Sequence, residues 1–274
     1  MPSKDISIII RIEGGIADDG MLDVYDAADT ISGIARSINI IAHAFGNDEK
    51  IRKQGQAAHG SHTYIHSSKK GCFEERIDVR FDEKICSKIG GSIISNAFWD
   101  YLSWTWSYTL GEERQPTTPY VRKIAEKKDL FVDEVANVLE SPIHDMHKSI
   151  SRDNNVKVYI NRPKVGDILT LNTETLDYVT TREERAEQEY IIGNITRTSV
   201  TSHFGRLFSD EENRILSFEF ANQDDRRAKD LALRSMREYN QGLDGKFHLK
   251  VSKILNARGT VKRYIVHDLL EIRK

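Results

Sequence analysis

Apolar and polar residues alternate in ISIIIRIEG near the start of the chain, which predicts a β-strand over about residues 5 to 13. A helix is expected over about residues 23 to 46, because isoleucine, alanine and phenylalanine recur there at spacings of three and four and form one apolar stripe. Two strands, near residues 61–68 and 72–81, are joined by a Lys-Lys-Gly sequence that is typical of a tight turn. The chain therefore begins with a β-α-β-β order.

A long helix is expected over about residues 83 to 110, with Asp82 as its N-terminal cap. Its apolar residues lie on most of its sides, so this helix should be buried between the sheet and another layer. A further helix is expected over about residues 119 to 139, and Ser141-Pro142 predicts the start of another. The first part of the chain thus follows a β-α-β-β-α-α order, an α+β layer with helices on one face of a small sheet.

From Asn154 onward, short β-branched segments separated by polar or glycine turns predict an antiparallel β-barrel or sandwich, and a barrel of the OB or SH3 type is preferred. One inserted helix is expected over about residues 224 to 240. The polar run around residue 153 is the predicted boundary between an α+β domain, residues 1–152, and a β-barrel domain, residues 153–274. Candidate strands cover residues 156–160, 166–171, 174–181, 189–198, 203–208, 213–220, 246–255 and 260–272.

Charge differs between these two parts. Residues 1–152 hold 19 basic and 23 acidic side chains, a net charge of −4. Residues 153–274 hold 21 basic and 19 acidic side chains, a net charge of +2. The whole chain has a net charge of −2, which argues against a protein that coats nucleic acid by charge alone but leaves room for a local basic patch. No segment is long and apolar enough to predict a membrane helix, and the two cysteines have neither disulfide-framework nor metal spacing, so a cytoplasmic location is expected.

Three stretches of the chain, EGGIADDGMLDVYDAADTISGIARSINI, TPYVRKI and GTVKRYIVHDLLEI, resemble an uncharacterised group of bacterial proteins. Proteins of this group pair an α/β N-terminal part with a small C-terminal β-barrel. The resemblance covers most of the chain and implies the same two-part layout and a bacterial or mobile-element origin. It implies no activity and no catalytic residue.

Three histidines fall within eight positions of the predicted hairpin. His59 is expected in the loop before the strand, whereas His62 and His66 lie about 13 Å apart along it, too far to share one metal ion. The sequence therefore favours a polar contact surface over a metal centre, formed by His62, Tyr64, His66 and Arg76. The turn predicts the cross-strand pairs His66–Glu74, Tyr64–Arg76 and His62–Asp78.

A polar stripe runs along the first predicted helix, on the side opposite its isoleucines. It combines a carboxylate, a hydroxyl, a guanidinium, an amide and an imidazole without lysine or glutamate, a mixture typical of a surface that contacts a specific partner. An ordinary solvated face is the alternative. The stripe consists of Asp29, Ser32, Arg36, Asn39 and His43.

His144 and His147 share a helical face, but a helix that starts at Pro142 would remove Glu140 from that face. An exposed helix surface is therefore favoured over a metal site for this pair. The chain has no signature of a serine, cysteine or metal hydrolase. We assign no catalytic residue, no cofactor and no metal ligand from the sequence.

Aromatic and basic residues alternate in RTSVTSHFGRLF and KFHLKVSKILNARGTVKRY. Small barrels bind single-stranded nucleic acid through basic grooves with stacking aromatic side chains. The alternative, which the small net charge favours, is that these cations only keep strand edges from aggregating. The candidate nucleic-acid contacts are Arg197, Arg206, Lys250, Lys253, Lys262 and Arg263.

The function that the sequence favours is a non-catalytic binding or assembly component that acts through protein–protein contacts, including self-association. Trp99, Trp104 and Trp106 are candidates for a homodimer surface, since aromatic side chains are enriched in interfaces. Nucleic-acid binding by the barrel is the first alternative. A metal-dependent hydrolase that uses His59, His62, His66 or Asp78 is the second.

Overall fold

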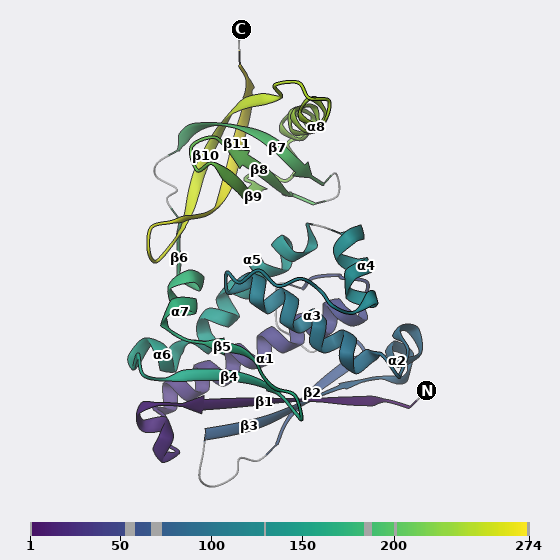
Figure 1. Cartoon of the computed structure of the whole chain (residues 1–274), viewed down its shortest axis with the longest axis vertical. Coiled ribbons are helices and arrows are strands. Elements are labelled where there is room, and N and C mark those ends of the chain that lie inside the picture. The colour runs from purple at the N-terminus through teal and green to yellow at the C-terminus, as the bar shows by residue number, and fades with distance from the viewer. Residues whose placement is uncertain are drawn as a thin grey trace. The chain divides into compact units, whose positions relative to one another are not determined.

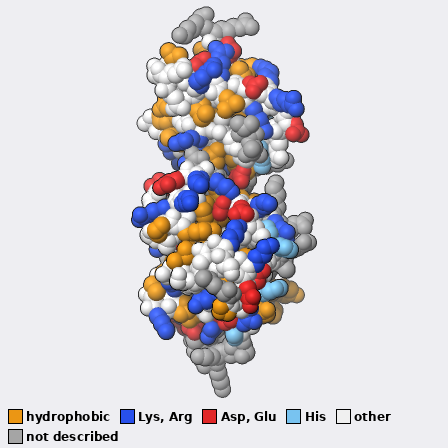
Figure 2. All heavy atoms as spheres, turned by 90° about the vertical axis from the view of Figure 1, so that its right-hand side faces the viewer, with side chains coloured by type: hydrophobic (Ala, Val, Ile, Leu, Met, Phe, Trp, Pro, Cys, Tyr) orange, Lys and Arg blue, Asp and Glu red, His pale blue; other side chains and the backbone are white. Residues whose placement is uncertain are grey.

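The computed structural model describes residues 2–52, 58–66, 73–128, 130–183, 188–199 and 202–272. Contacts divide the chain into two compact units, Met1–Val179 and Thr180–Lys274 (Figure 1). The predicted boundary near residue 153 lies before this division. The two strands that follow it, residues 157–162 and 166–171, pair with the N-terminal sheet and so belong to the first unit. On the face drawn in Figure 2, acidic and basic side chains are intermixed on each unit.

The first unit contains a five-stranded sheet in the order β2-β3-β1-β4-β5, and all of its strand pairs are antiparallel. Its central strand is β1 (Lys4–Glu13), in which every second residue is a buried isoleucine. This alternation gives the sheet one apolar face, covered by helices, and one polar face. The other strands are β2 (Ser61–Ile65), β3 (Phe73–Phe81), β4 (Lys157–Arg162) and β5 (Gly166–Leu171).

The apolar stripe predicted on the first helix is confirmed: α1 (Val24–Gly46) packs along α5 (Phe131–Met146) and the sheet. The side chain of Asp23 caps α1 by accepting hydrogen bonds from the amides of Tyr25 and Asp26. The remaining helical elements of this unit are η1 (Gly15–Asp19), α2 (Glu83–Ile89), α3 (Ile94–Thr109), α4 (Pro119–Lys127), α6 (Lys148–Arg152) and α7 (Thr173–Val179).

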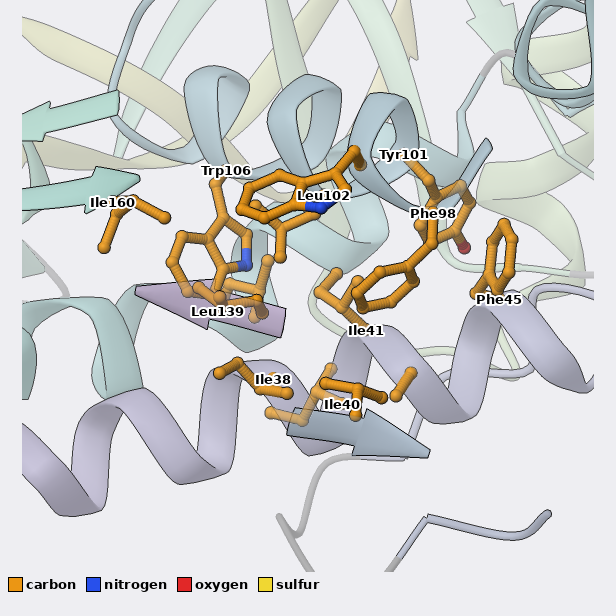
Figure 3. Close-up of a cluster of buried hydrophobic side chains, with 14 of the residues drawn as sticks. Ile38, Ile40, Ile41, Phe45, Phe98, Tyr101, Leu102, Trp106, Leu139 and Ile160 are labelled. Carbon is orange, nitrogen blue, oxygen red and sulfur yellow. The ribbon is translucent and has the colours of Figure 1, made fainter. Parts of the chain in front are cut away.

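The mainly aliphatic core of the first unit contains a cluster of aromatic rings. Rings of Phe45, Phe98 and Tyr101 meet edge to face at centroid distances of 5.3 to 5.4 Å, between α1 and α3 (Figure 3). Trp99, Trp104 and Trp106 are all buried in this unit. The expected burial of this helix is confirmed, because α3 packs its aromatic residues inside the unit. The homodimer contact suggested for the three tryptophans stays a prediction.

Four predicted elements of this unit differ from the structure. The helix expected over residues 119–139 is two helices, α4 and the first part of α5. The helix expected over residues 83–110 is two helices, because Gly90, with φ of 107°, ends α2. Pro142 lies inside α5 instead of starting a new helix. Residues 174–181, expected as a strand, begin with α7, since the side chain of Asn172 caps the amides of Glu174 and Thr175 at 2.8 and 3.0 Å.

The second unit is a closed five-stranded barrel in the order β7-β8-β9-β11-β10 and back to β7. The predicted barrel with one inserted helix is confirmed, but β9 and β11 are parallel, so the barrel is mixed and not wholly antiparallel. This strand order, with a helix between the third and fourth strands, is that of an OB-type barrel. The elements are β6 (Thr181–Glu183), β7 (Glu189–Thr198), β8 (Phe204–Ser209), β9 (Arg214–Phe220), α8 (Arg226–Asn240), β10 (Lys246–Asn256) and β11 (Val261–Glu271).

Alternate residues of these strands, among them Leu207, Phe218, Leu249 and Tyr264, fill the barrel interior. Their neighbours in sequence therefore point to the outside of the barrel. Among the described residues, no helix is both long and apolar enough to cross a membrane.

Candidate functional site

An arginine row crosses the outer face of the barrel. Arg197 on β7 is opposite Arg206 on β8, Arg206 is opposite Ser217 on β9, and Ser217 is opposite Arg263 on β11. Directly opposed residues lie on the same face of a sheet, and neighbouring strands are about 4.8 Å apart. Arg197 is exposed, and Arg206 and Arg263 are half-buried. We call Arg197, Arg206 and Arg263 the arginine row.

A second row runs beside the first one. Phe204 on β8 is opposite Glu219 on β9, and Glu219 is opposite Ile265 on β11. The ring of His203 lies 4.3 Å from that of Phe204, and its Nε2 is 3.8 Å from a carboxylate oxygen of Glu219. The face thus places apolar and aromatic side chains next to arginines, with Glu219 as a nearby acidic group that limits the positive potential.

The three candidate lysines stand apart from this row. Lys250 is opposite Tyr190 of β7 on another part of the barrel. Lys253 forms an ion pair of 2.6 Å with Glu189; burial by itself would lower the pKa of this lysine, but the ion pair raises it. Lys262 precedes Arg263, next to an irregular step in the pairing of β10 with β11. The structure therefore brings together three of the six candidate residues.

A hollow of about 480 Å³ lies at the end of β7, where that strand meets the start of α8. Sequence reasoning did not find it, because its lining comes from two segments that are distant in the chain. The hollow combines two cations with two carboxylates, two hydroxyls and an amide. Its lining residues are Thr198, Ser199, Gln223, Asp224, Arg226, Lys229, Asp230 and Leu233.

The predicted histidine surface lies on the uncovered face of the N-terminal sheet. The observed pairs are Tyr64 with Asp78 and His62 with Arg80, so the predicted register is wrong by two residues. This register pairs Ile65 with Ile77, an apolar match, whereas the predicted pairs would have placed Glu75 opposite Ile65. A shift of two residues keeps each side chain on its expected face. The predicted Lys-Lys-Gly turn lies outside the described residues.

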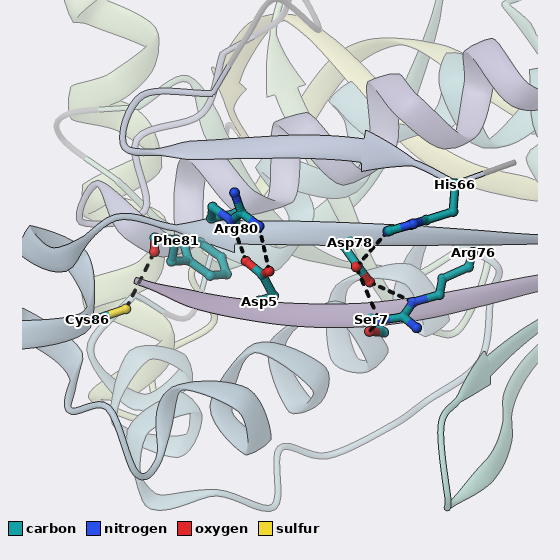
Figure 4. A network of polar contacts seen from close by, with 8 residues as sticks. All are labelled: Asp5, Ser7, His66, Arg76, Asp78, Arg80, Phe81 and Cys86. Atoms are coloured by element: carbon teal, nitrogen blue, oxygen red, sulfur yellow. Dashed lines mark hydrogen bonds and ion pairs between the residues drawn. The ribbon is translucent and has the colours of Figure 1, made fainter. Parts of the chain in front are cut away.

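Asp78 is the centre of a polar network on this face (Figure 4). Its carboxylate accepts hydrogen bonds from His66 Nε2 at 2.7 Å and from Arg76 Nε at 3.1 Å, and Arg76 also donates to Ser7. Burial by itself would raise the pKa of Asp78, but hydrogen bonds from Ser7, Arg76 and His66 lower it. Asp78 and His66 are thus hydrogen-bonded to each other. No group of three or more metal-binding side chains is placed to hold an ion in the described parts of the chain.

We expect Asp78→Asn to lower the free energy of unfolding of the first unit by about 1 to 2 kcal/mol, because Arg76 and His66 lose a charged acceptor that is almost buried. Urea unfolding followed by tryptophan fluorescence measures the free energy of unfolding of the first unit alone, since all three tryptophans belong to this unit. Asp5→Asn is the matched control. The Asp5 carboxylate forms an ion pair with Arg80 but is 40% exposed, so this substitution should lower the free energy of unfolding by less. Equal losses would contradict the central role of Asp78.

The polar stripe of α1 is partly used inside the unit. Arg36 pairs with Asp145 of α5 at 2.8 Å, and Asn39 accepts a hydrogen bond from Thr63 of β2. The Nδ1 of His43 accepts a hydrogen bond from the amide of His59, and burial lowers the pKa of His43. These three residues hold α1 against neighbouring segments, whereas the other two members of the stripe, Asp29 and Ser32, are exposed.

His147 is fully buried, so the prediction that it lies on an exposed helix surface is wrong. Its Nδ1 is 2.7 Å from the carbonyl oxygen of Ile143, and its Nε2 is 2.9 Å from the hydroxyl of Thr175 in α7. The ring therefore links the end of α5 to α7. His144, three residues earlier, remains partly exposed.

Residues 8–180 match the family described as a domain of unknown function, DUF7946. No curated protein and no solved structure matches the chain. The match ends where the contacts divide the chain, so it covers the sheet and helices of the first unit, and the barrel lies beyond it. Because the matched segment is more than half of the chain, the protein belongs to the DUF7946 family.

Proposed function

We propose that the C-terminal barrel binds single-stranded nucleic acid through the arginine row. The observation that carries this proposal is the strand register, which aligns Arg197, Arg206 and Arg263 on one outer face of the barrel. OB-type barrels use the face of their second and third strands, here β8 and β9, for oligonucleotides. Arg206 lies on that second strand, between the other two arginines.

The charge of the barrel unit supports an anionic ligand. Residues 180–274 contain 18 Lys and Arg against 15 Asp and Glu, a net charge of +3, whereas residues 1–179 contain 22 against 27, a net charge of −5. Guanidinium groups bind phosphate oxygens in bidentate geometry and stack on bases. Because the excess of charge is small and Glu219 lies close by, affinity should be moderate and should depend strongly on salt.

Arg197→Gln and Arg206→Gln should each weaken binding of a fluorescein-labelled oligothymidylate of 15 nucleotides by about fivefold, because each removes a phosphate contact. Fluorescence anisotropy between about 50 and 200 mM salt should show a slope of log affinity against log salt that is shallower by about 0.7 for each arginine removed. The full chain should prefer this single strand to the corresponding duplex.

Arg234→Gln is the matched control, because Arg234 belongs to the same unit but lies on α8, outside the arginine row, where it pairs with Glu238 and Glu271. It should leave both the affinity and the salt slope unchanged. If the doubly substituted Arg197→Gln, Arg206→Gln chain bound the oligonucleotide as wild type does, the arginine row would have no part in binding.

Protein–protein contact, the function that the sequence favours, is the second candidate. The observation that favours it is a group of exposed apolar side chains in the first unit, at Ile16, Met21, Val24 and Tyr25. This group lies outside the residues proposed from the sequence as partner contacts.

A further inference from the structure

Four large apolar side chains are exposed within ten residues at the start of α1. Their exposed fractions are 51% for Ile16, 56% for Met21, 73% for Val24 and 78% for Tyr25. Single exposed apolar residues are common, but exposed apolar residues that gather in one place are characteristic of interaction sites. A backbone hydrogen bond joins Met21 to Ile16, and Val24 and Tyr25 are adjacent at the start of α1. We call these four residues the apolar patch.

The segment that carries the apolar patch has a fixed conformation. The carboxylate of Asp18 accepts a hydrogen bond of 2.6 Å from the amide of Gly14, and the amide of Met21 donates to the carbonyl of Ile16. Ala17, between them, is buried in the core. A Cβ atom at Gly14, whose φ is 94°, would collide with the backbone of Asn155. The patch is therefore presented on an ordered support, which reduces the entropic cost of binding a partner.

Acidic residues predominate in the segment that carries the apolar patch. No lysine or arginine occurs in the sequence between Arg11 and Arg36. Arg152 approaches the patch from α6, but it is engaged by the carboxylates of Asp23 at 3.3 Å and Asp26 at 2.9 Å. The acidic residues of this segment are Glu13, Asp18, Asp19, Asp23, Asp26 and Asp29.

We propose that the apolar patch docks a basic segment of a partner protein, one that carries apolar anchor side chains flanked by lysine or arginine. The apolar side chains would bury the anchors, and the surrounding carboxylates would attract the cations and speed the encounter. Nucleic acids and anionic membrane surfaces are disfavoured as occupants, because the same carboxylates repel phosphate groups. Tyr25 is the expected centre of the contact, since tyrosine is enriched among residues that dominate binding energy.

This proposal concerns the second candidate function and is independent of the arginine row. The probe is a fluorescein-labelled peptide of 15 residues with leucine at helical spacing and lysine elsewhere, measured against the full chain by fluorescence anisotropy. The full chain should bind this peptide, and it should not bind the matched peptide in which glutamate replaces lysine. Tyr25→Ser should weaken binding by about tenfold. Asp19→Asn combined with Asp29→Asn should weaken it by a smaller factor that disappears at high salt.

Tyr190→Ser is the matched control, because Tyr190 is an exposed tyrosine on the barrel, with 58% of its surface accessible. It should bind the lysine peptide as wild type does. Absence of binding to the lysine peptide, equal binding of the glutamate peptide, or an unchanged affinity of the Tyr25→Ser chain would overturn the proposal. If light scattering showed a wild-type dimer that Tyr25→Ser dissociates, a second copy would be the occupant and the proposal would also fail.

Discussion

Gly33→Ala is expected to lower the free energy of unfolding of the first unit by about 3 kcal/mol, although alanine is the better helix former by about 1 kcal/mol. The reason is the close approach of α1 to α5. A Cβ atom at Gly33 would lie 2.5 Å from the carbonyl oxygen of Pro142 and 2.8 Å from the amide nitrogen of Met146. Both are backbone atoms, so no side-chain rotation can relieve the overlap, and the two helices must move apart.

Tryptophan fluorescence during urea unfolding gives the free energy of this unit, and its slope against urea should be unchanged. Ser32→Ala is the matched control, since Ser32 is the preceding residue of α1 but is exposed. Alanine there should be neutral or slightly stabilising. A stabilised Gly33→Ala chain would mean that helix propensity outweighs the packing of α1 on α5.

The close approach of α1 to α5 at Gly33 could not be predicted from the sequence. The isoleucines of α1 reveal its buried face, because the spacing of apolar residues is a local property of the chain. Gly33 stands within the same helix, but the atoms that require a glycine belong to Pro142 and Met146, more than a hundred positions later. No pattern of neighbouring residues in the sequence indicates that these backbone atoms lie so close to Gly33. The same holds for His147, whose partner Thr175 lies in a segment expected to be a strand.

Strand faces were more predictable than strand registers. The period of two along a strand assigned His62, Tyr64 and Arg76 to one face correctly, but the predicted pairs depended on a turn and were shifted by two residues. In the barrel, Arg197 meets Arg206 only because the register of β7 and β8 shifts after Ile195. Arg263 joins them through a parallel pair of strands that the sequence did not indicate. The arginines were therefore recognisable individually, but their alignment was not.

Exposure was the least predictable property. The segment from Gly15 to Asp29 contains η1 and the start of α1, which confirms the helix expected from about residue 23. Nothing in its composition distinguished Val24 and Tyr25, which face solvent, from Ala17, which is buried. The distinction depends on the contact of η1 with β1 and the chain near Asn155, which fixes the side of the segment that faces the core.

Lowering the pH from 7 to about 4 is expected to destabilise the first unit by about 3 kcal/mol through His147 alone. Burial of this ring lowers its pKa from 6.5 to about 4, so the folded protein keeps it neutral. Between these two pH values the unfolded chain binds a proton that the folded chain does not. Stability is therefore fully present above pH 6.5 and is lost as the pH falls toward 4. His43, whose pKa is also lowered by burial, acts in the same direction.

His147→Gln should remove this part of the pH dependence, because glutamine does not titrate but can still hydrogen-bond to Ile143 and Thr175. At pH 7 the variant should be less stable than wild type by about 1 to 2 kcal/mol, and near pH 4.5 the two curves should approach or cross. His62→Gln, at an exposed position of the same unit, is the matched control and should follow wild type across the range. Urea unfolding at half-unit pH intervals, read by tryptophan fluorescence, measures each curve. Parallel curves for His147→Gln and wild type would mean that the buried ring is not what makes the fold sensitive to acid.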